Sequence, residues 1–305
     1  MDINVVINQV LMLFFPIVIG YAIIKLGVVN ESFTKNLSAF VFNVTLPCAI
    51  VSAFQFDFER DILIKSAALI FISAALVVFS WVLGLVLAKL LRERGFNKNV
   101  IVYSMMFSNF SFMGYPIAKA FMGDAGLIYA TMFSLPLFVF VQSWGVALIN
   151  SEGERKFKRS YILNAPLIGA VLGFIMFLAE IRFPTAIDGT ISSLGSMTTP
   201  LAMVLVGLAL SMEPLKKCFT NFKFYIVALI RLVVLPLIVF YGLQVLRIDI
   251  DICRVSAIIS MMPVAANLII TSAAFGKDTA NPARVVLLTT VLSIFTIPLM
   301  GFILF

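Results

Sequence analysis

Apolar stretches of about 20 residues alternate with short polar segments along the whole chain, a length at which an α-helix crosses about 30 Å of hydrocarbon. Little of the chain lies outside these stretches. The pattern therefore predicts an all-α integral membrane protein of ten transmembrane helices that has no soluble domain. The stretches cover about residues 5–27, 33–54, 63–88, 100–121, 126–149, 161–180, 189–211, 223–246, 254–275 and 283–304.

The composition supports this interpretation, since 62% of the residues are hydrophobic, 12% are charged and the mean hydropathy is +1.09. A soluble domain carries about 25% charged residues. The first apolar stretch lacks the form of a cleaved signal peptide, because Asp2 is the only charge before it and no A-x-A-like cleavage site follows. We expect this stretch to span the membrane as well.

The net charge of +7 arises mainly in the loops. Basic residues concentrate in alternate loops, above all within residues 89–98, 155–159 and 216–223. The positive-inside rule assigns such loops to the cytoplasm. We therefore expect a cytoplasmic (inner) membrane protein with both termini outside the cytoplasm. The partner of the basic loops is then the lipid bilayer and no nucleic acid.

The most charged stretch, residues 151–159, separates two halves with five apolar stretches each. Because five is odd, the second half enters the membrane from the opposite face, and similar halves then form inverted repeats. Residues 46–51 resemble 199–204, and residues 120–124 resemble 274–278, at offsets of about half the chain. We predict a first five-helix repeat over residues 1–150, a charged cytoplasmic linker over 151–160 and a second, inverted repeat over 161–305.

Two apolar stretches in corresponding positions of the halves are interrupted, one within residues 109–116 and the other within 263–267. Proline lacks an N–H and disrupts the preceding helical turn, and hydrocarbon tolerates the freed carbonyls only where they line a cavity or lie within protein. A pair of such interruptions marks the substrate site of many transporters. We predict that the broken helices 4 and 9 cross at mid-membrane; the alternative is two proline kinks that serve packing alone.

The positive ends of two half-helices would meet at such a crossing, and together they carry about one positive charge. This favours an anion, such as a carboxylate. The predicted substrate-binding residues are Asn109, Ser111, Asn267 and Asn43, and the predicted crossover residues are Gly114, Pro116 and Pro263. Arg231 lies inside a span, where it is either a gate or a side chain that snorkels to the interface.

Other functional classes lack the residues that they need. The chain has no histidine, and Cys48, Cys218 and Cys253 are too far apart in sequence for a metal or redox motif. The Asp and Glu residues fall in loops or near span ends, so a proton relay inside the membrane is missing. We therefore expect no enzyme, no metal and no cofactor, with Na⁺ coupling through carbonyls and hydroxyls left open.

Several stretches resemble a known family, the auxin efflux carriers. Asn109-x-x-x-Met113-Gly114-x-Pro116 resembles the fourth span of that family, and residues 200–210 resemble its seventh. Pro263, together with Phe275, Gly276 and residues 287–298, resembles the ninth and tenth spans. The short central loop resembles the bacterial-type members, which are described as malate or malonate permeases or left uncharacterised.

This resemblance implies a scaffold of spans 1, 2, 6 and 7, a transport domain of spans 3–5 and 8–10, an elevator-type cycle and often a homodimer. It also implies that Asn109 contacts the substrate carboxylate, since Asn109 matches the asparagine that does so in the plant carriers. Asn267 departs from the plant pattern, so its role rests on the helix dipoles alone.

The expected function is secondary transport of small organic anions, namely carboxylates such as malate, malonate or auxin-like acids. One alternative is an Na⁺-coupled carrier of bile-acid-like anions or a cation/proton antiporter, although an antiporter would carry an Asp in mid-membrane. An alternative outside transport is a membrane receptor that binds a carboxylate without moving it.

Overall fold

A computed structural model describes residues 15–55, 60–91, 98–150, 165–212, 222–275 and 277–305. The described residues form helices and contain no β-strand. Within these described ranges, six helices are long and apolar enough to cross a membrane, which agrees with the predicted all-α integral membrane protein. The predicted linker of residues 151–160, Cys218 and the start of the first apolar stretch lie outside the described residues.

The first half of the chain contains the helix Phe15–Lys25, α2 (Glu31–Phe40), η1 (Val41–Thr45), α3 (Leu46–Ala53), α4 (Arg60–Leu90), α5 (Lys98–Met106), η2 (Phe110–Gly114), α6 (Tyr115–Phe140), η3 (Val141–Gly145) and α7 (Val146–Ile149). The second half contains α8 (Ala165–Leu178), α9 (Thr185–Ser196), α10 (Thr198–Met212), α12 (Phe222–Leu229), η5 (Ile230–Val234), α13 (Leu235–Val245), α14 (Ile250–Ser260), α15 (Asn267–Ala274) and α16 (Ala280–Leu304). The η elements are π-helical turns.

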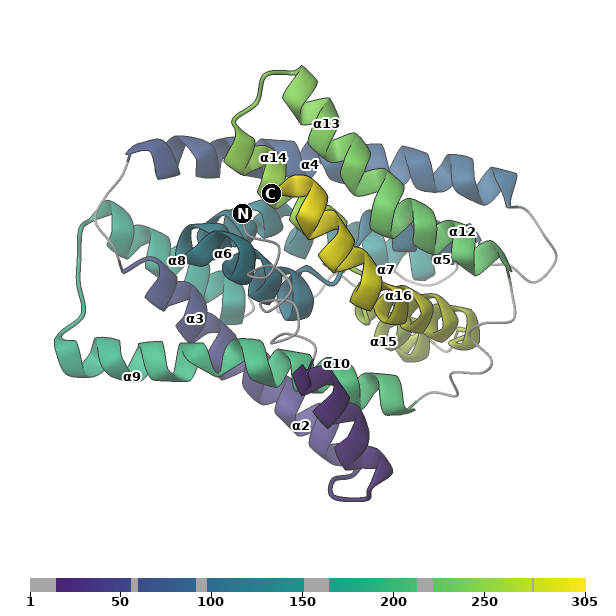
Figure 1. Cartoon of the computed structure of the whole chain (residues 1–305), viewed down its shortest axis with the longest axis horizontal. Helices are drawn as coiled ribbons and strands as arrows, with labels where there is room; N and C mark the ends of the chain where they lie inside the picture. The colour runs from purple at the N-terminus through teal and green to yellow at the C-terminus, as the bar shows by residue number, and fades with distance from the viewer. Residues whose placement is uncertain (1–14, 56–59, 92–97, 151–164, 213–221, 276) are drawn as a thin grey trace.

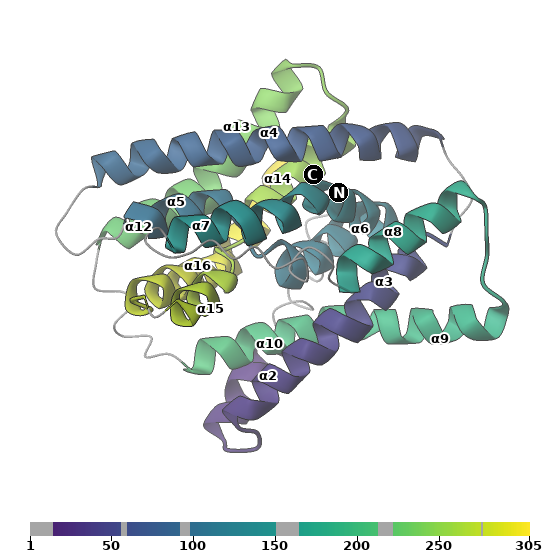
Figure 2. The ribbon, with the colours of Figure 1, turned by 180° about the vertical axis from the view of Figure 1, so that it is seen from behind.

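The helices pack in two groups. In one group α3 lies against α8 and α9, and α2 lies against α10. In the other group α4 lies against α5, α6 and α14, while α12 contacts α16. Figures 1 and 2 show α4 on one side of the molecule and α9 with α10 on the opposite side. The groups meet where α3 contacts α6 and α10 contacts η2.

Three prolines directly follow wide π-helical turns. In each case the residue before the proline donates its N–H to a carbonyl five residues back, as Tyr115 does to Phe110 ahead of Pro116. Leu46 and Leu235 do the same ahead of Pro47 and Pro236. Proline frees one carbonyl because it has no N–H. The wider turn accommodates this locally, so these prolines bend their helices without ending them.

The helices α5 and α14 are enclosed by protein on all sides. Residues 100–106 of α5 and residues 252–260 of α14 except Arg254 are buried. A helix that is apolar all round is typical of the interior of a large or membrane-embedded protein. By contrast, Phe71 on α4 is 77% exposed and suits contact with lipid. The ends of α5 and α14 therefore lie deep within one helix group.

Candidate functional site

Two helices end inside the protein, and the chain segments that follow them pair with each other at a place that is called the crossing below. Helix α5 ends at Met106 and α14 ends at Ser260, and Ser108 and Val264 form an antiparallel β-bridge between the two interruptions. The N–H of Asn109 donates to the carbonyl oxygen of Pro263 at 2.7 Å, and the N–H of Ala265 donates to that of Phe107 at 3.2 Å. Both apolar stretches are therefore interrupted, and the interruptions face each other.

The first interruption lies earlier in the chain than the sequence predicts. It covers residues 107–109, and η2 then begins at Phe110, so that Gly114 and Pro116 lie in the resumed helix. The carbonyl oxygen of Asn109 starts this helix by accepting the N–H groups of Met113 and Gly114. Pro116 therefore does not cause the break, because proline fits the first turns of a helix. Pro263, in contrast, lies within the second interruption.

A residue that the sequence reasoning missed supports the crossing. Thr289 of α16 is fully buried, and its hydroxyl oxygen Oγ1 accepts the N–H of Val264 at 3.1 Å. The same hydroxyl donates to the carbonyl oxygen of Val285, one turn back, at 2.8 Å. A helical threonine usually bonds only to its own helix, so the local pattern carries no sign of this role.

Arg231 lies in η5 and points into the crossing. Its side chain is buried, since the residue is only 2% exposed. The guanidinium donates from Nη1 to the carbonyl oxygen of Met105 at 2.7 Å and from Nε to that of Met262 at 3.2 Å. The interpretation that Arg231 snorkels to the interface is therefore wrong. The guanidinium instead reaches the carboxyl ends of α5 and α14, where carbonyls have no partner within their own helix.

The structure brings some of the predicted binding residues to the crossing. Asn109 precedes η2 and Ser111 lies in its first turn, and both are half-buried. Asn267 begins α15, three residues beyond Val264, and is exposed. Asn43 is also exposed, and its amide donates to the carbonyl of Ala39 in its own helix at 2.8 Å. Asn109, Ser111 and Asn267 thus mark the starts of the two resumed helices.

A cavity of about 150 Å³ lies where the two helix groups meet, beside the resumed helix that contains Pro116. The hydroxyl of Thr198 is buried and has no hydrogen-bond partner among the described residues. Lys119 also lines the cavity, and its ammonium pairs with the exposed Asp124 at 2.8 Å. The full lining consists of Leu46, Ala49, Tyr115, Pro116, Lys119, Leu127, Gly195, Ser196, Thr198 and Thr199.

Comparison with known proteins identifies the family. The model of a family described as "Membrane transport protein" matches residues 5–159 and 154–301. The chain belongs to this family. It is the auxin efflux carrier family that the sequence motifs resemble, so that prediction is confirmed.

Two curated relatives of this membrane transport protein are archaeal. An uncharacterized transporter of Methanothermobacter thermautotrophicus is 26% identical over 304 residues, which are 96% of each chain. An uncharacterized transporter of Methanocaldococcus jannaschii is 26% identical over 307 residues, 97% of this chain and 98% of the relative. The chain is thus a multi-pass membrane protein of a transporter family.

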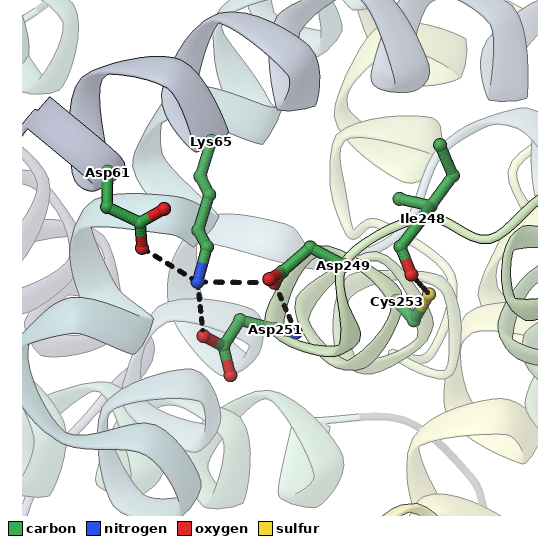
Figure 3. A network of polar contacts seen from close by, with 6 residues as sticks. All are labelled: Asp61, Lys65, Ile248, Asp249, Asp251 and Cys253. Carbon is green, nitrogen blue, oxygen red and sulfur yellow. Dashed lines mark hydrogen bonds and ion pairs between the residues drawn. The ribbon is translucent and has the colours of Figure 1, made fainter.

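An ion-pair cluster of the transporter joins the beginnings of α4 and α14. Figure 3 shows three carboxylates around the ammonium of Lys65, with Asp61 at 2.9 Å, Asp251 at 2.8 Å and Asp249 at 3.3 Å. Asp249 also caps α14 by accepting the N–H of Asp251 at 2.9 Å. The cluster therefore fixes the start of the interrupted helix α14 against the continuous helix α4.

Proposed function

We propose that this protein is a secondary transporter of small organic anions, in particular carboxylates such as malate, malonate or auxin-like acids, and that the substrate binds at the crossing. The observation that carries the proposal is the pair of resumed helices, which begin at Phe110 and Asn267 beside hydrogen-bonded, antiparallel chain segments. In transporters with discontinuous helices, the backbone groups at the helix starts can hold a charged ligand.

The electrostatics of the resumed helices favour a negative ligand. The first N–H groups of a helix have no intrahelical partner, and each helix start carries about half a positive charge. Two such starts supply about one positive charge, which matches one carboxylate. Asn109 and Ser111 add polar groups at the same place, and both remain half-buried rather than enclosed. We propose that they bind the carboxylate together with Asn267.

The cavity supports a small substrate. Its volume of about 150 Å³ lies well below the 300–1,000 Å³ of sites for drug-sized ligands. Its wall offers the hydroxyls of Ser196, Thr198 and Thr199 on one side and the ammonium of Lys119 on the other. The Thr198 hydroxyl is buried and lacks a partner in the described structure, so a bound polar ligand would satisfy it.

The two helix groups support an elevator-type mechanism. We propose that Phe15–Lys25, α2, α3 and α8–α10 form the scaffold, and that α4–α7 and α12–α16 form the transport domain. Both interrupted helices then belong to the transport domain, so the site moves as one body. The cavity lies between this domain and α3, α9 and α10. This division corresponds to ten spans in two inverted five-helix repeats, in an inner membrane with both termini outside the cytoplasm.

The transport proposal is tested by counterflow in proteoliposomes. Labelled malate, malonate and indole-3-acetate are exchanged against the same unlabelled acid inside the vesicles. We expect exchange of at least one acid, together with a rise in the melting temperature of the purified protein, since a ligand that binds only the folded state stabilises it. A receptor would show the stabilisation without the exchange.

The location of the site is tested by two asparagine variants. Asn109→Leu should abolish exchange, because it removes the polar group at the start of η2. Asn43→Leu is the matched control, because the Asn43 amide is bonded within its own helix. Equal exchange by Asn109→Leu and the unmodified protein would place the substrate elsewhere.

A further inference from the structure

The carboxyl ends of α5 and α14 create a local excess of negative charge at the crossing. Each helix end carries about half a negative charge on its unpaired carbonyls. The carbonyl of Met105 would normally accept the N–H of Asn109, four residues on, but that N–H bonds to Pro263 instead. Without compensation, these ends would offset the positive starts of the resumed helices, and an anion would gain little at the crossing.

Arg231 supplies the compensation. The guanidinium bridges the two helix ends through the carbonyls of Met105 and Met262. Among the described residues it pairs with no carboxylate, since the ion pairs there involve Lys65 and Lys119. A buried charge needs a counter-charge, and the two helix ends together provide about one negative charge. The guanidinium and the helix ends therefore neutralise each other.

A small polar cavity beside Arg231 contains no further charge. Its volume is about 20 Å³, which is room for about one water molecule. Hydroxyls of Ser73, Ser80, Ser108 and Ser260 line it, and none of its lining residues is acidic. The Ser73 hydroxyl is fully buried and without a partner in the described structure. The cavity thus contains no negative charge, and the guanidinium of Arg231 already neutralises the helix ends. No negative charge therefore remains there to attract a cation in addition to Arg231.

We propose that Arg231 is a positioning residue that acts as a built-in cation between the two helix ends and so makes the crossing selective for anions. This inference rests on the proposed function, because it explains how the crossing retains about one net positive charge for one carboxylate. A transporter with a neutral side chain at this position would need a bound cation there. The unmodified protein therefore needs none, and its anion binding is independent of Na⁺.

The first experiment measures cation dependence. Counterflow of the accepted carboxylate is compared in Na⁺, K⁺ and choline media. The unmodified protein and Arg231→Lys should exchange equally in all three. Arg231→Ala should lose about tenfold or more of its exchange in choline, because charge-assisted hydrogen bonds are lost. It should recover part of this exchange in Na⁺ medium, or when guanidinium is added to the choline medium. A requirement for Na⁺ in the unmodified protein would overturn the inference but leave the transport proposal intact.

The second experiment needs no substrate. The melting temperatures of purified variants are followed while guanidinium is added at millimolar concentration. Arg231→Ala should melt lower than the unmodified protein and regain stability in a saturable way as guanidinium fills the vacated space. The matched control is Arg254→Ala, because Arg254 also donates from Nε to a carbonyl, that of Leu304 at 3.1 Å, but is only half-buried.

The outcomes of the second experiment separate the two proposals. Saturable stabilisation of Arg231→Ala, absent from Arg254→Ala and from the unmodified protein, supports a cation site even if no carboxylate is transported. Indifference of Arg231→Ala to guanidinium overturns the built-in cation. If Arg231→Ala does not fold, Arg231→Gln takes its place, and Arg231→Lys must retain the thermal stability that a fixed positive charge provides.

Discussion

The hydrogen bond between Val264 and Thr289 offers a sharp test of the crossing. Both residues are fully buried, and the N–H of Val264 reaches Thr289 Oγ1 at 3.1 Å. Thr289→Val keeps the shape of the side chain but removes the acceptor. The N–H of Val264 would then remain buried without this partner, and an unsatisfied buried donor costs about 1–3 kcal/mol. The ratio of folded to unfolded protein should fall by about 5- to 150-fold.

A variant of the neighbouring residue, Thr290, is the control for the hydrogen bond between Val264 and Thr289. Thr290 is also buried on α16 and also donates to a carbonyl one turn back, that of Val286, at 2.7 Å. Thr290→Val therefore removes a hydroxyl with the same local bond but without a contact to the crossing. Its cost should stay below about 1 kcal/mol, because the carbonyl of Val286 keeps its helical N–H partner. The difference between the two variants then measures the bond to Val264.

The assay is reversible unfolding in mixed micelles of a mild detergent and increasing SDS, followed by circular dichroism. Counterflow of the transported carboxylate is measured in parallel, and Thr289→Val should also slow it because the crossing loosens. Thr289→Ser retains the hydroxyl and should behave more like the unmodified protein. Equal free energies of unfolding for Thr289→Val and Thr290→Val would refute the argument, as would a Thr289→Ser variant as unstable as Thr289→Val.

Two further predictions concern packing and charge. Gly207→Ala should lower the free energy of unfolding by about 1–3 kcal/mol, because its new methyl group would overlap the carbonyl oxygen of Ile17. Gly189→Ala is the control, because its methyl group would meet open space. Thermal melts should show it to be neutral or stabilising. Lys65→Met should lower the melting temperature more than Lys119→Met, because the Lys65 side chain is 12% exposed among three carboxylates and that of Lys119 is 45% exposed beside one. High salt should reduce the difference between the two melting temperatures, because it screens the repulsion among the three carboxylates that Lys65→Met leaves without a cation. Equal melting temperatures of the two variants at low salt would contradict this prediction.

Local patterns in the sequence were sufficient for the class of fold and for the existence of the interruptions. The length of each apolar run matches the thickness of the hydrocarbon that a helix must cross. A helix is expected there because it forms all its backbone hydrogen bonds within itself. Pro263 lies within an interruption because its missing N–H acts on the immediately preceding turn. The same reasoning misplaced the break near Pro116, since a π-helical turn can accommodate a proline without ending the helix.

Contacts between distant segments were decided by the tertiary structure alone. Arg231 and Met105 lie 126 residues apart in the chain, and Val264 in the second interruption lies 25 residues from Thr289 on α16. Periodicity and helix propensity describe neighbours within a few turns, so they identify Arg231 as a charge in an apolar span but cannot identify its partners. The guanidinium finds those partners only when two helix ends meet, because unpaired carbonyls become strong acceptors once packing has removed them from water.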